Sequence, residues 1–286
     1  MKFATIQAPL PLPLPLPLLI VVATVASLAT FCHAFQVHHI PSSPAASILL
    51  GSRRSIMPNL ALAASAIETT AENVDADITA AKEILNKAAD SKKEDPEIVM
   101  EALLKLEKLM RQKAKEEQQE GTISSAVGEE IKSQLHGNWR LIFTTGTANT
   151  QNKYGKINYF PIKAVQTFRT QNRDPMKISN GIFVGDFPVV KFSGDMDFDI
   201  IKRKLEFDFT ELLVFNFLKI NLGKGDAAKI GASTGLGSES NVANAKKGRQ
   251  AFFNWISADE NIATARGGGG GLALWKRIPM EDEEEE

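Results

Sequence analysis

Strict alternation of apolar and polar residues over positions 190–200 constrains the fold of this 286-residue chain more than any other feature. The apolar positions are Val190, Phe192, Gly194, Met196, Phe198 and Ile200, and the intervening residues are Lys191, Ser193, Asp195, Asp197 and Asp199. Because successive side chains of a strand point to opposite faces, this pattern predicts a strand with one buried and one solvated face. Alternation resumes over 205–210, which predicts an antiparallel hairpin.

The two-residue period begins directly after Gly137 and continues towards the C-terminus. Further predicted strands cover residues 139–144, 156–160, 164–170, 181–187, 250–257 and 272–278. The nearly continuous apolar run 212–222 predicts either a strand buried on both faces or one between the barrel interior and the helices. About eight or nine strands with no helices between them argue against a parallel α/β fold, and leave a closed up-and-down barrel or a sandwich.

Residues 68–134, before the strands, have the period of amphipathic helices. Apolar residues recur at three- and four-residue spacing over 77–89. Asp95 and Pro96 supply an N-cap and a first-turn proline for a second helix, and Val127, Ile131 and Leu135 indicate a third. The polar faces mix acids with bases, which favours packing on the barrel over lying on a membrane surface. We therefore expect an α+β, mainly β fold, with N-terminal amphipathic helices before an antiparallel up-and-down barrel at 135–280.

The first 67 residues have the composition of targeting segments. No acidic residue precedes Glu68, and an apolar run at 18–28 leads to small residues around Ala34. A run of about eleven residues is shorter than the ~20 that span a bilayer, so it predicts a signal peptide over 1–34 in preference to a retained anchor. Residues 35–67 are typical of a transit peptide. Together they resemble the bipartite presequence of algae with secondary plastids, so we expect a plastid location.

Arg53 and Arg54 precede a short apolar stretch and an A-x-A sequence, as in a twin-arginine signal for the thylakoid lumen. The stretch is interrupted by Pro58. We therefore favour ordinary transit-peptide arginines, and a location in the stroma or on a plastoglobule or thylakoid surface.

Composition excludes several classes of function. The formal net charge of -1 argues against a nucleic-acid partner. Cys32 and all histidines except His136 lie in the leader, which leaves the body without disulfides, thiol catalysis or a His-rich metal site. The three aspartates at 195, 197 and 199 lack the spacing of a calcium loop and fit a solvated strand face better. We expect no catalytic residue, metal or cofactor.

The glycine-rich segment 223–248 interrupts the strands. It is long for a structureless connection inside a compact domain, and predicts a flexible loop or lid. Its glycines match neither phosphate-binding pattern, so nucleotide binding is not expected. The acidic residues 281–286 predict a solvated, disordered tail.

Large apolar side chains dominate the face that would point into the barrel. An interior with few polar anchors suits an apolar ligand, and barrels of about eight strands can hold one small molecule. Filling of a solid core explains the same residues equally well. The candidate ligand-binding residues are Phe143, Phe192, Met196, Phe198, Phe207 and Phe209.

Two motifs carry a resemblance to a known family. Residues 135–145, LHGNWRLIFTT, look like the L-x-G-x-W-x-L-x-Y/F-T-T opening of the plastid lipid-associated proteins, also called fibrillins, and Gly137-x-Trp139 is similar to the first-strand motif of lipocalins. Arg266, Gly267 and the strand after the glycine turn resemble the family's final R-G-x-x-G-x-L-F-V pair. The match covers roughly 78–278. Ala263 departs from the pattern, which has an arginine there, and segment 223–248 is enlarged.

The resemblance implies a lipocalin-like barrel and a non-catalytic protein of plastoglobules or thylakoids that binds a carotenoid, quinone, tocopherol or fatty acid. We expect Trp139 to plug one barrel end with Arg266 stacked on it by a cation–π contact, and Gly137 and Gly267 to belong to the same closure. The main alternative is a structural coat protein of lipid globules with a solid barrel. An enzyme that uses Asp or Glu alone on a lipid is a distant third.

Overall fold

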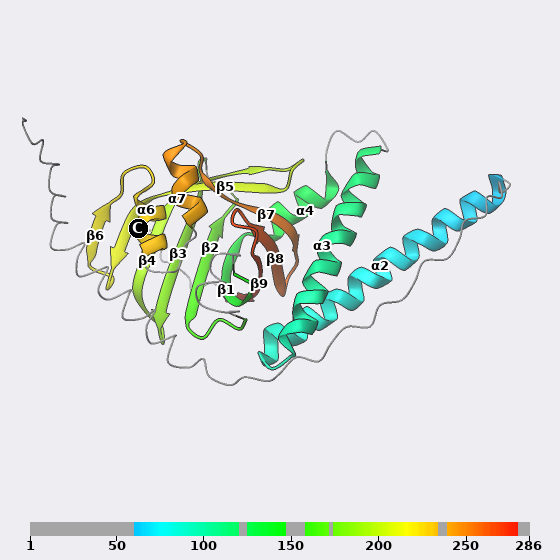
Figure 1. Cartoon of the computed structure of the whole chain (residues 1–286), viewed down its shortest axis with the longest axis horizontal. Helices are drawn as coiled ribbons and strands as arrows, with labels where there is room; N and C mark the ends of the chain where they lie inside the picture. The colour runs from blue at the N-terminus through cyan, green and yellow to red at the C-terminus, as the bar shows by residue number, and fades with distance from the viewer. Residues whose placement is uncertain (1–59, 120–124, 147–157, 172–173, 234–238, 280–286) are drawn as a thin grey trace, which may run out of the picture.

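The computed structural model describes residues 60–119, 125–146, 158–171, 174–233 and 239–279 (Figure 1). Its N-terminal part is helical, with α2 (Leu60–Ser91), α3 (Pro96–Gln119) and α4 (Ala126–Gln134). The strands are β1 (Gly137–Thr144), β2 (Lys163–Arg169), β3 (Met176–Val184), β4 (Phe187–Asp199), β5 (Lys204–Val214), β6 (Leu218–Asn221), β7 (Ala251–Ala258), β8 (Ile262–Gly267) and β9 (Leu272–Ile278). The predicted signal peptide and acidic tail lie outside the described residues. Helix α2 begins inside the stretch predicted as a transit peptide.

Antiparallel pairing closes the sheet into a barrel. Among the described residues, the ring of eight strands has the order β4-β3-β2-β1-β9-β8-β7-β5, and a β4–β5 pairing closes it. β7 pairs with the first half of β5 and β6 with the second half, so β6 extends the edge outside the ring. This architecture confirms the predicted class, an α+β, mainly β fold with a lipocalin-like barrel after N-terminal helices.

The apolar run 212–222 is a hairpin, and the prediction of one continuous strand was wrong. β5 ends at Val214 and β6 begins at Leu218. Between them Phe215 and Asn216 have φ angles of 50° and 61°. Left-handed backbone is uncommon for residues other than glycine, so the sequence gives no sign of this turn. In the predicted strand 156–160, Tyr159 forms an isolated bridge to Phe143, and residues 156 and 157 lie outside the described part.

Segment 223–248 contains two short helices, α6 (Asp226–Ser233) and α7 (Glu239–Lys246), where we expected an irregular loop. Alanine is the strongest helix former, and alanines in both stretches outweigh the flanking glycines. Ile230 anchors α6 because it is buried with Val190, Leu212 and Val214 of the barrel wall. A role of this segment as a lid stays a prediction.

The N-terminal helices cover the outer face of β7, β8 and β9 (Figure 1). α2 and α3 pack against each other as a hairpin, and Leu85, Leu103 and Leu106 are fully buried in the same core as the barrel residues. The helices therefore pack on the barrel, as their mixed-charge polar faces indicated.

One end of the barrel interior is filled with side chains. The rings of Phe168 of β2 and Trp255 of β7 meet edge to face, with their centroids 5.4 Å apart. Because β2 and β7 are not neighbours in the sheet, this contact crosses the barrel interior. Trp139 is fully buried, and its indole N–H donates to the carbonyl of Leu135 at 2.8 Å. We call this half of the barrel the closed end.

Candidate functional site

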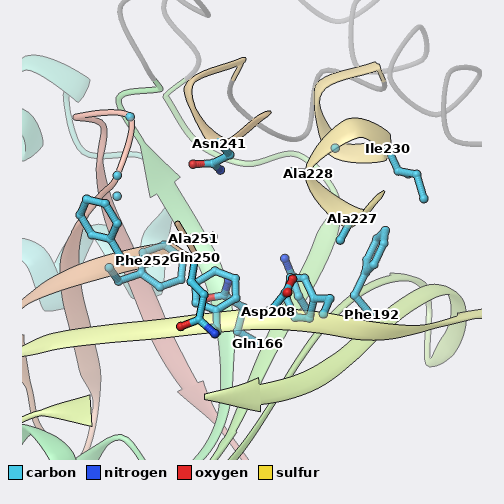
Figure 2. A pocket seen from close by; sticks show the side chains of 18 of the residues that line it. Gln166, Phe192, Asp208, Ala227, Ala228, Ile230, Asn241, Gln250, Ala251 and Phe252 are labelled. Carbon is cyan, nitrogen blue, oxygen red and sulfur yellow. The ribbon is translucent and has the colours of Figure 1, made fainter. Parts of the chain in front are cut away.

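The other half of the barrel contains a partly open cavity of about 370 Å³. This volume lies within the usual range for small-molecule sites. Ala227, Ala228 and Ile230 of α6 and Asn241 of α7 lie on one side, across the open space from Gln166, Asp208 and Phe192 of the strands (Figure 2). Further lining residues on the strands are Leu141, Thr144, Ala164, Asn180, Ile182, Val190, Phe207, Phe209, Ala251, Phe252, Phe253, Gly267, Ala273 and Trp275.

Aromatic rings in successive contact form much of the cavity wall. The ring centroids of Phe192 and Phe209 are 5.5 Å apart, and those of Phe209 and Phe207 are 5.2 Å apart. Phe207 stacks on Phe253 at 5.3 Å, and Phe253 meets Trp275 edge to face at 5.8 Å. Such a wall removes apolar ligand surface from water and offers ring faces for stacking.

The structure brings three of the predicted ligand-binding residues, Phe192, Phe207 and Phe209, together in this wall. Met196 and Phe198 also occupy the inner face, opposite Phe207 and Leu205 in the ladder. They are buried in the core and do not line the cavity. Core filling therefore holds at the closed end, while Phe192, Phe207 and Phe209 line a cavity in the other half, and ligand binding by them stays a prediction.

Phe143 points away from the interior, contrary to the prediction. The register of β1 and β9 shifts after Leu141, which pairs with Trp275, so that Phe143 pairs with Leu274. Directly paired residues share a face and a bulge adds one residue, so Phe143 moves to the outer face and Thr144 takes the inner position. The Phe143 ring packs against Tyr159 at 5.3 Å, and the Tyr159 hydroxyl donates to the carbonyl of Glu94, between α2 and α3.

Arg277, not Arg266, stacks on Trp139. The two residues are opposite each other in the β1–β9 ladder, and the guanidinium carbon lies 4.2 Å from the indole centroid. The guanidinium also donates to backbone carbonyls of Gln134, His136, Asp259 and Glu260. This arrangement closes the barrel with a cation–π contact and charged hydrogen bonds.

Arg266 instead faces the helices. It pairs with Leu272 on the outer face of β8, whereas Ala265 and Gly267 face inwards. Its guanidinium forms a bidentate ion pair with Glu107 of α3, with Nε to Oε1 at 2.8 Å. The hydrogen bonds between the two side chains lower the pKa of Glu107 and raise the pKa of Arg266. The prediction that Arg266 stacks on Trp139 was therefore wrong, because one step along a strand reverses the face.

The two predicted closure glycines lie at different ends. Gly137 has a φ of 131°, and a Cβ there would lie 3.1 Å from the Arg277 guanidinium, so Gly137 belongs to the closed end. Gly267 lines the cavity, and its N–H donates to the carbonyl of Gly271 within the β8–β9 turn. Gly267 is therefore part of the cavity half, contrary to the prediction.

Sequence reasoning missed the polar groups of the cavity. Gln166 and Asn180 line it from β2 and β3, and Lys224 and Arg249 line it from the segments flanking α6 and α7. Asp208 also lines it, and burial raises the pKa of this carboxyl. The sequence did hold a signal for these polar groups, namely a polar residue at a position that alternation places inside the barrel. Gln166 is such a residue, because it shares the inner face of its strand with Ala164 and Phe168.

The described residues contain no group of three or more His, Cys, Asp or Glu side chains that could hold a metal ion. Asp195 and Asp199, from the acidic face of β4, pair with Lys177 and Lys202. No helix in the described ranges has both the length and the apolar character to cross a bilayer.

A closed antiparallel barrel with a cavity in one half has the architecture of a lipocalin-like barrel. The family model PAP_fibrillin matches residues 115–274, from α3 to β9. This match takes in more than half of the chain, so the chain belongs to the PAP/fibrillin family, which confirms the resemblance seen in the motifs. The family consists of plastid lipid-associated proteins and is generally non-catalytic. No curated protein and no solved structure matches the chain.

Proposed function

We propose that this protein binds one hydrophobic molecule, an isoprenoid lipid or a fatty acid, in its barrel cavity, without catalysis, at a plastid membrane or lipid-globule surface. The observation that carries the proposal is the cavity of about 370 Å³ with its aromatic wall. Removing about 200 Å² of apolar ligand surface from water would contribute roughly 5 kcal/mol before the entropy loss of binding.

An exposed apolar tip next to the cavity supports the contact with a lipid surface. Val184, Phe187 and Phe217 are 63%, 50% and 79% exposed. They lie at the ends of the β3–β4 and β5–β6 hairpins, which are adjacent because the N–H of Phe215 donates to the carbonyl of Val189 at 2.9 Å. Exposed apolar patches mark interaction sites, and this one continues into the cavity wall through Ile182 and Val190.

Lipid retained by the purified protein tests the binding proposal. Organic extraction and mass spectrometry should recover one molecule of lipid per chain, and prenylquinones should quench tryptophan emission saturably because Trp275 lines the cavity. Ala228→Phe fills the cavity from α6 and should reduce retention at least tenfold, whereas Ala243→Phe, exposed on α7 and outside the cavity lining, should not. A protein that retains no lipid and shows no quenching would rule out the proposed binding.

A second candidate, a coat protein of lipid globules, is favoured by the same apolar tip. Flotation with lipid globules separates the two functions. A coat protein would float without a stoichiometric ligand, and Ala228→Phe would leave flotation unchanged. Replacing Val184, Phe187 and Phe217 together by serine should abolish flotation in either case, while a carrier would keep its bound lipid.

A further inference from the structure

We infer that the bound molecule carries an uncharged hydroxyl or carbonyl group at its inner end, and that Gln166 and Trp275 hydrogen-bond this group. The inference rests on the proposed lipid binding and specifies the chemical class of the ligand. It predicts a neutral amphiphile that enters with its polar group first and leaves its apolar body against the aromatic wall.

Two buried polar atoms in the cavity wall have no hydrogen-bond partner among the residues that the structure describes. Gln166 and Trp275 are 8% and 2% exposed, and both line the cavity. Within the described part of the chain, the Gln166 Oε1 and the Trp275 Nε1 form no hydrogen bond. A buried polar group left unsatisfied is destabilising, and a ligand group that hydrogen-bonds it would remove this penalty.

Gln166 and Trp275 occupy the inward positions of β2 and β9 next to the closed end. Gln166 pairs with Trp139, the residue that fills the closed end, and Trp275 precedes by two positions the Arg277 that stacks on Trp139. β2 and β9, which carry the two side chains, flank β1 on either side. A group bound between them would be the deepest part of the ligand.

The pair offers complementary hydrogen-bonding chemistry. The indole N–H only donates, and the amide presents a carbonyl acceptor together with an NH₂ donor. A ligand hydroxyl accepts from Trp275 and donates to the Gln166 carbonyl, while a ligand carbonyl accepts from Trp275 and from the amide NH₂. Prenyl alcohols, quinones, chromanols and hydroxylated carotenoids all carry such a group.

A carboxylate does not fit at this inner end. Arg277, beneath Trp139, directs its N–H groups to backbone carbonyls. The cationic residues that line the cavity, Lys224 and Arg249, belong to the segments next to α6 and α7. An ionised carboxylate beside Gln166 would be buried without a counter-charge, which strongly disfavours its binding there.

Calorimetric titration of the purified protein with a matched ligand series tests the inference. The series is geranylgeraniol, the corresponding C20 hydrocarbon without the hydroxyl, and geranylgeranoic acid. We expect the alcohol to bind at least tenfold more tightly than the hydrocarbon and the acid. Gln166→Leu should remove most of this preference by weakening alcohol binding, with hydrocarbon binding equal or stronger. Trp275→Phe, which retains an aromatic ring, should act in the same direction.

Ala243→Phe is the control, because Ala243 is exposed on α7 and lies outside the cavity lining. It should keep the preference for the alcohol. Equal binding of alcohol and hydrocarbon, or tighter binding of the acid, would overturn the inference and leave the proposed lipid binding intact. If no member of the series binds, the proposed function fails and the inference fails with it. Thermal unfolding of each variant separates a lost fold from a lost hydrogen bond.

Discussion

At the scale of single residues, the side on which a strand residue faces decides its role. Arg266 and Arg277 both lie on the last two strands, yet Arg266 pairs with Glu107 of α3 and Arg277 stacks on Trp139. Motif resemblance drew attention to Arg266, but the ladder that places Arg277 opposite Trp139 cannot be read from the motif. The same limit applied to Gln166 and Trp275, whose unpartnered atoms depend on the packing around them.

Arg277→Ala should destabilise the closed end. We expect a loss of about 2–4 kcal/mol in the free energy of unfolding, because the cation–π contact and several charged hydrogen bonds disappear together. Urea unfolding monitored by tryptophan emission measures it, and the emission of Trp139 should change in the folded state. Arg266→Ala is the control and should leave that emission unaltered. A change of the same size in both variants would contradict the assignment of Arg277.

The Glu107–Arg266 pair should make stability depend on pH at the acid end. The pKa of Glu107 is lowered in the folded state from its ordinary value of 4.5, mainly by the hydrogen bond from Arg266. A lowered pKa means that the stabilisation is fully present above pH 4.5 and is lost as the pH falls through the folded-state value. The difference in unfolding free energy between the wild type and Glu107→Gln should therefore be constant near neutrality and shrink below pH 4.5.

Chemical denaturation at a series of pH values measures this difference. The control is the same Glu107→Gln comparison in an Arg266→Gln background, where the pH-dependent part should largely vanish. Persistence of the full pH dependence without Arg266 would assign it to other groups.

At the scale of elements, periodicity predicted most strands, and local irregularities caused the errors. The alternation over 190–200 became β4, and the helical spacing before Gly137 became α2, α3 and α4. The bulge after Leu141 reversed the face of Phe143, and the turn at Phe215 divided an apolar run into β5 and β6. A bulge or a left-handed turn at ordinary residues leaves no periodic signal, because tertiary packing stabilises it.

Gly128 sets how closely α4 approaches the β4–β5 turn. A Cβ at this position would lie 2.1 Å from the carbonyl oxygen of Ile200. Alanine is about 1 kcal/mol better than glycine inside a helix, yet Gly128→Ala should destabilise the protein by about 1–3 kcal/mol because the backbone must move. Thermal unfolding shows whether Gly128→Ala lowers or raises the stability of the protein. Ser133→Ala, exposed in the same helix, should be neutral or slightly stabilising, and a stabilising Gly128→Ala would contradict the close contact.

At the scale of the whole molecule, the fold class and the family followed from the sequence, but the division of the barrel did not. An apolar inner face is compatible with a solid core or a hollow one, since the same phenylalanines serve both. Only the three-dimensional arrangement shows that Met196 and Phe198 fill the closed end while Phe192 and Phe209 line a cavity.

The leader should deliver the protein to the plastid. A fluorescent protein fused to residues 1–67 should accumulate in the plastid of an alga with secondary plastids, because the segment combines the composition of a signal peptide with that of a transit peptide. Removing residues 1–34 should leave the fusion in the cytosol. Retention of the complete fusion in the secretory pathway, seen by microscopy, would refute the bipartite leader.

The separation of a filled end from a hollow end also bears on how such a protein can change. Substitutions at Phe192 or Phe209 alter the shape of the hollow end, while the Trp139–Arg277 closure and the helix-covered strands continue to hold the chain together. Ligand preference and folding are therefore encoded by largely separate sets of side chains. Evolution or protein design could therefore change the lipid preference by substituting cavity-lining residues while the residues that stabilise the fold stay unchanged.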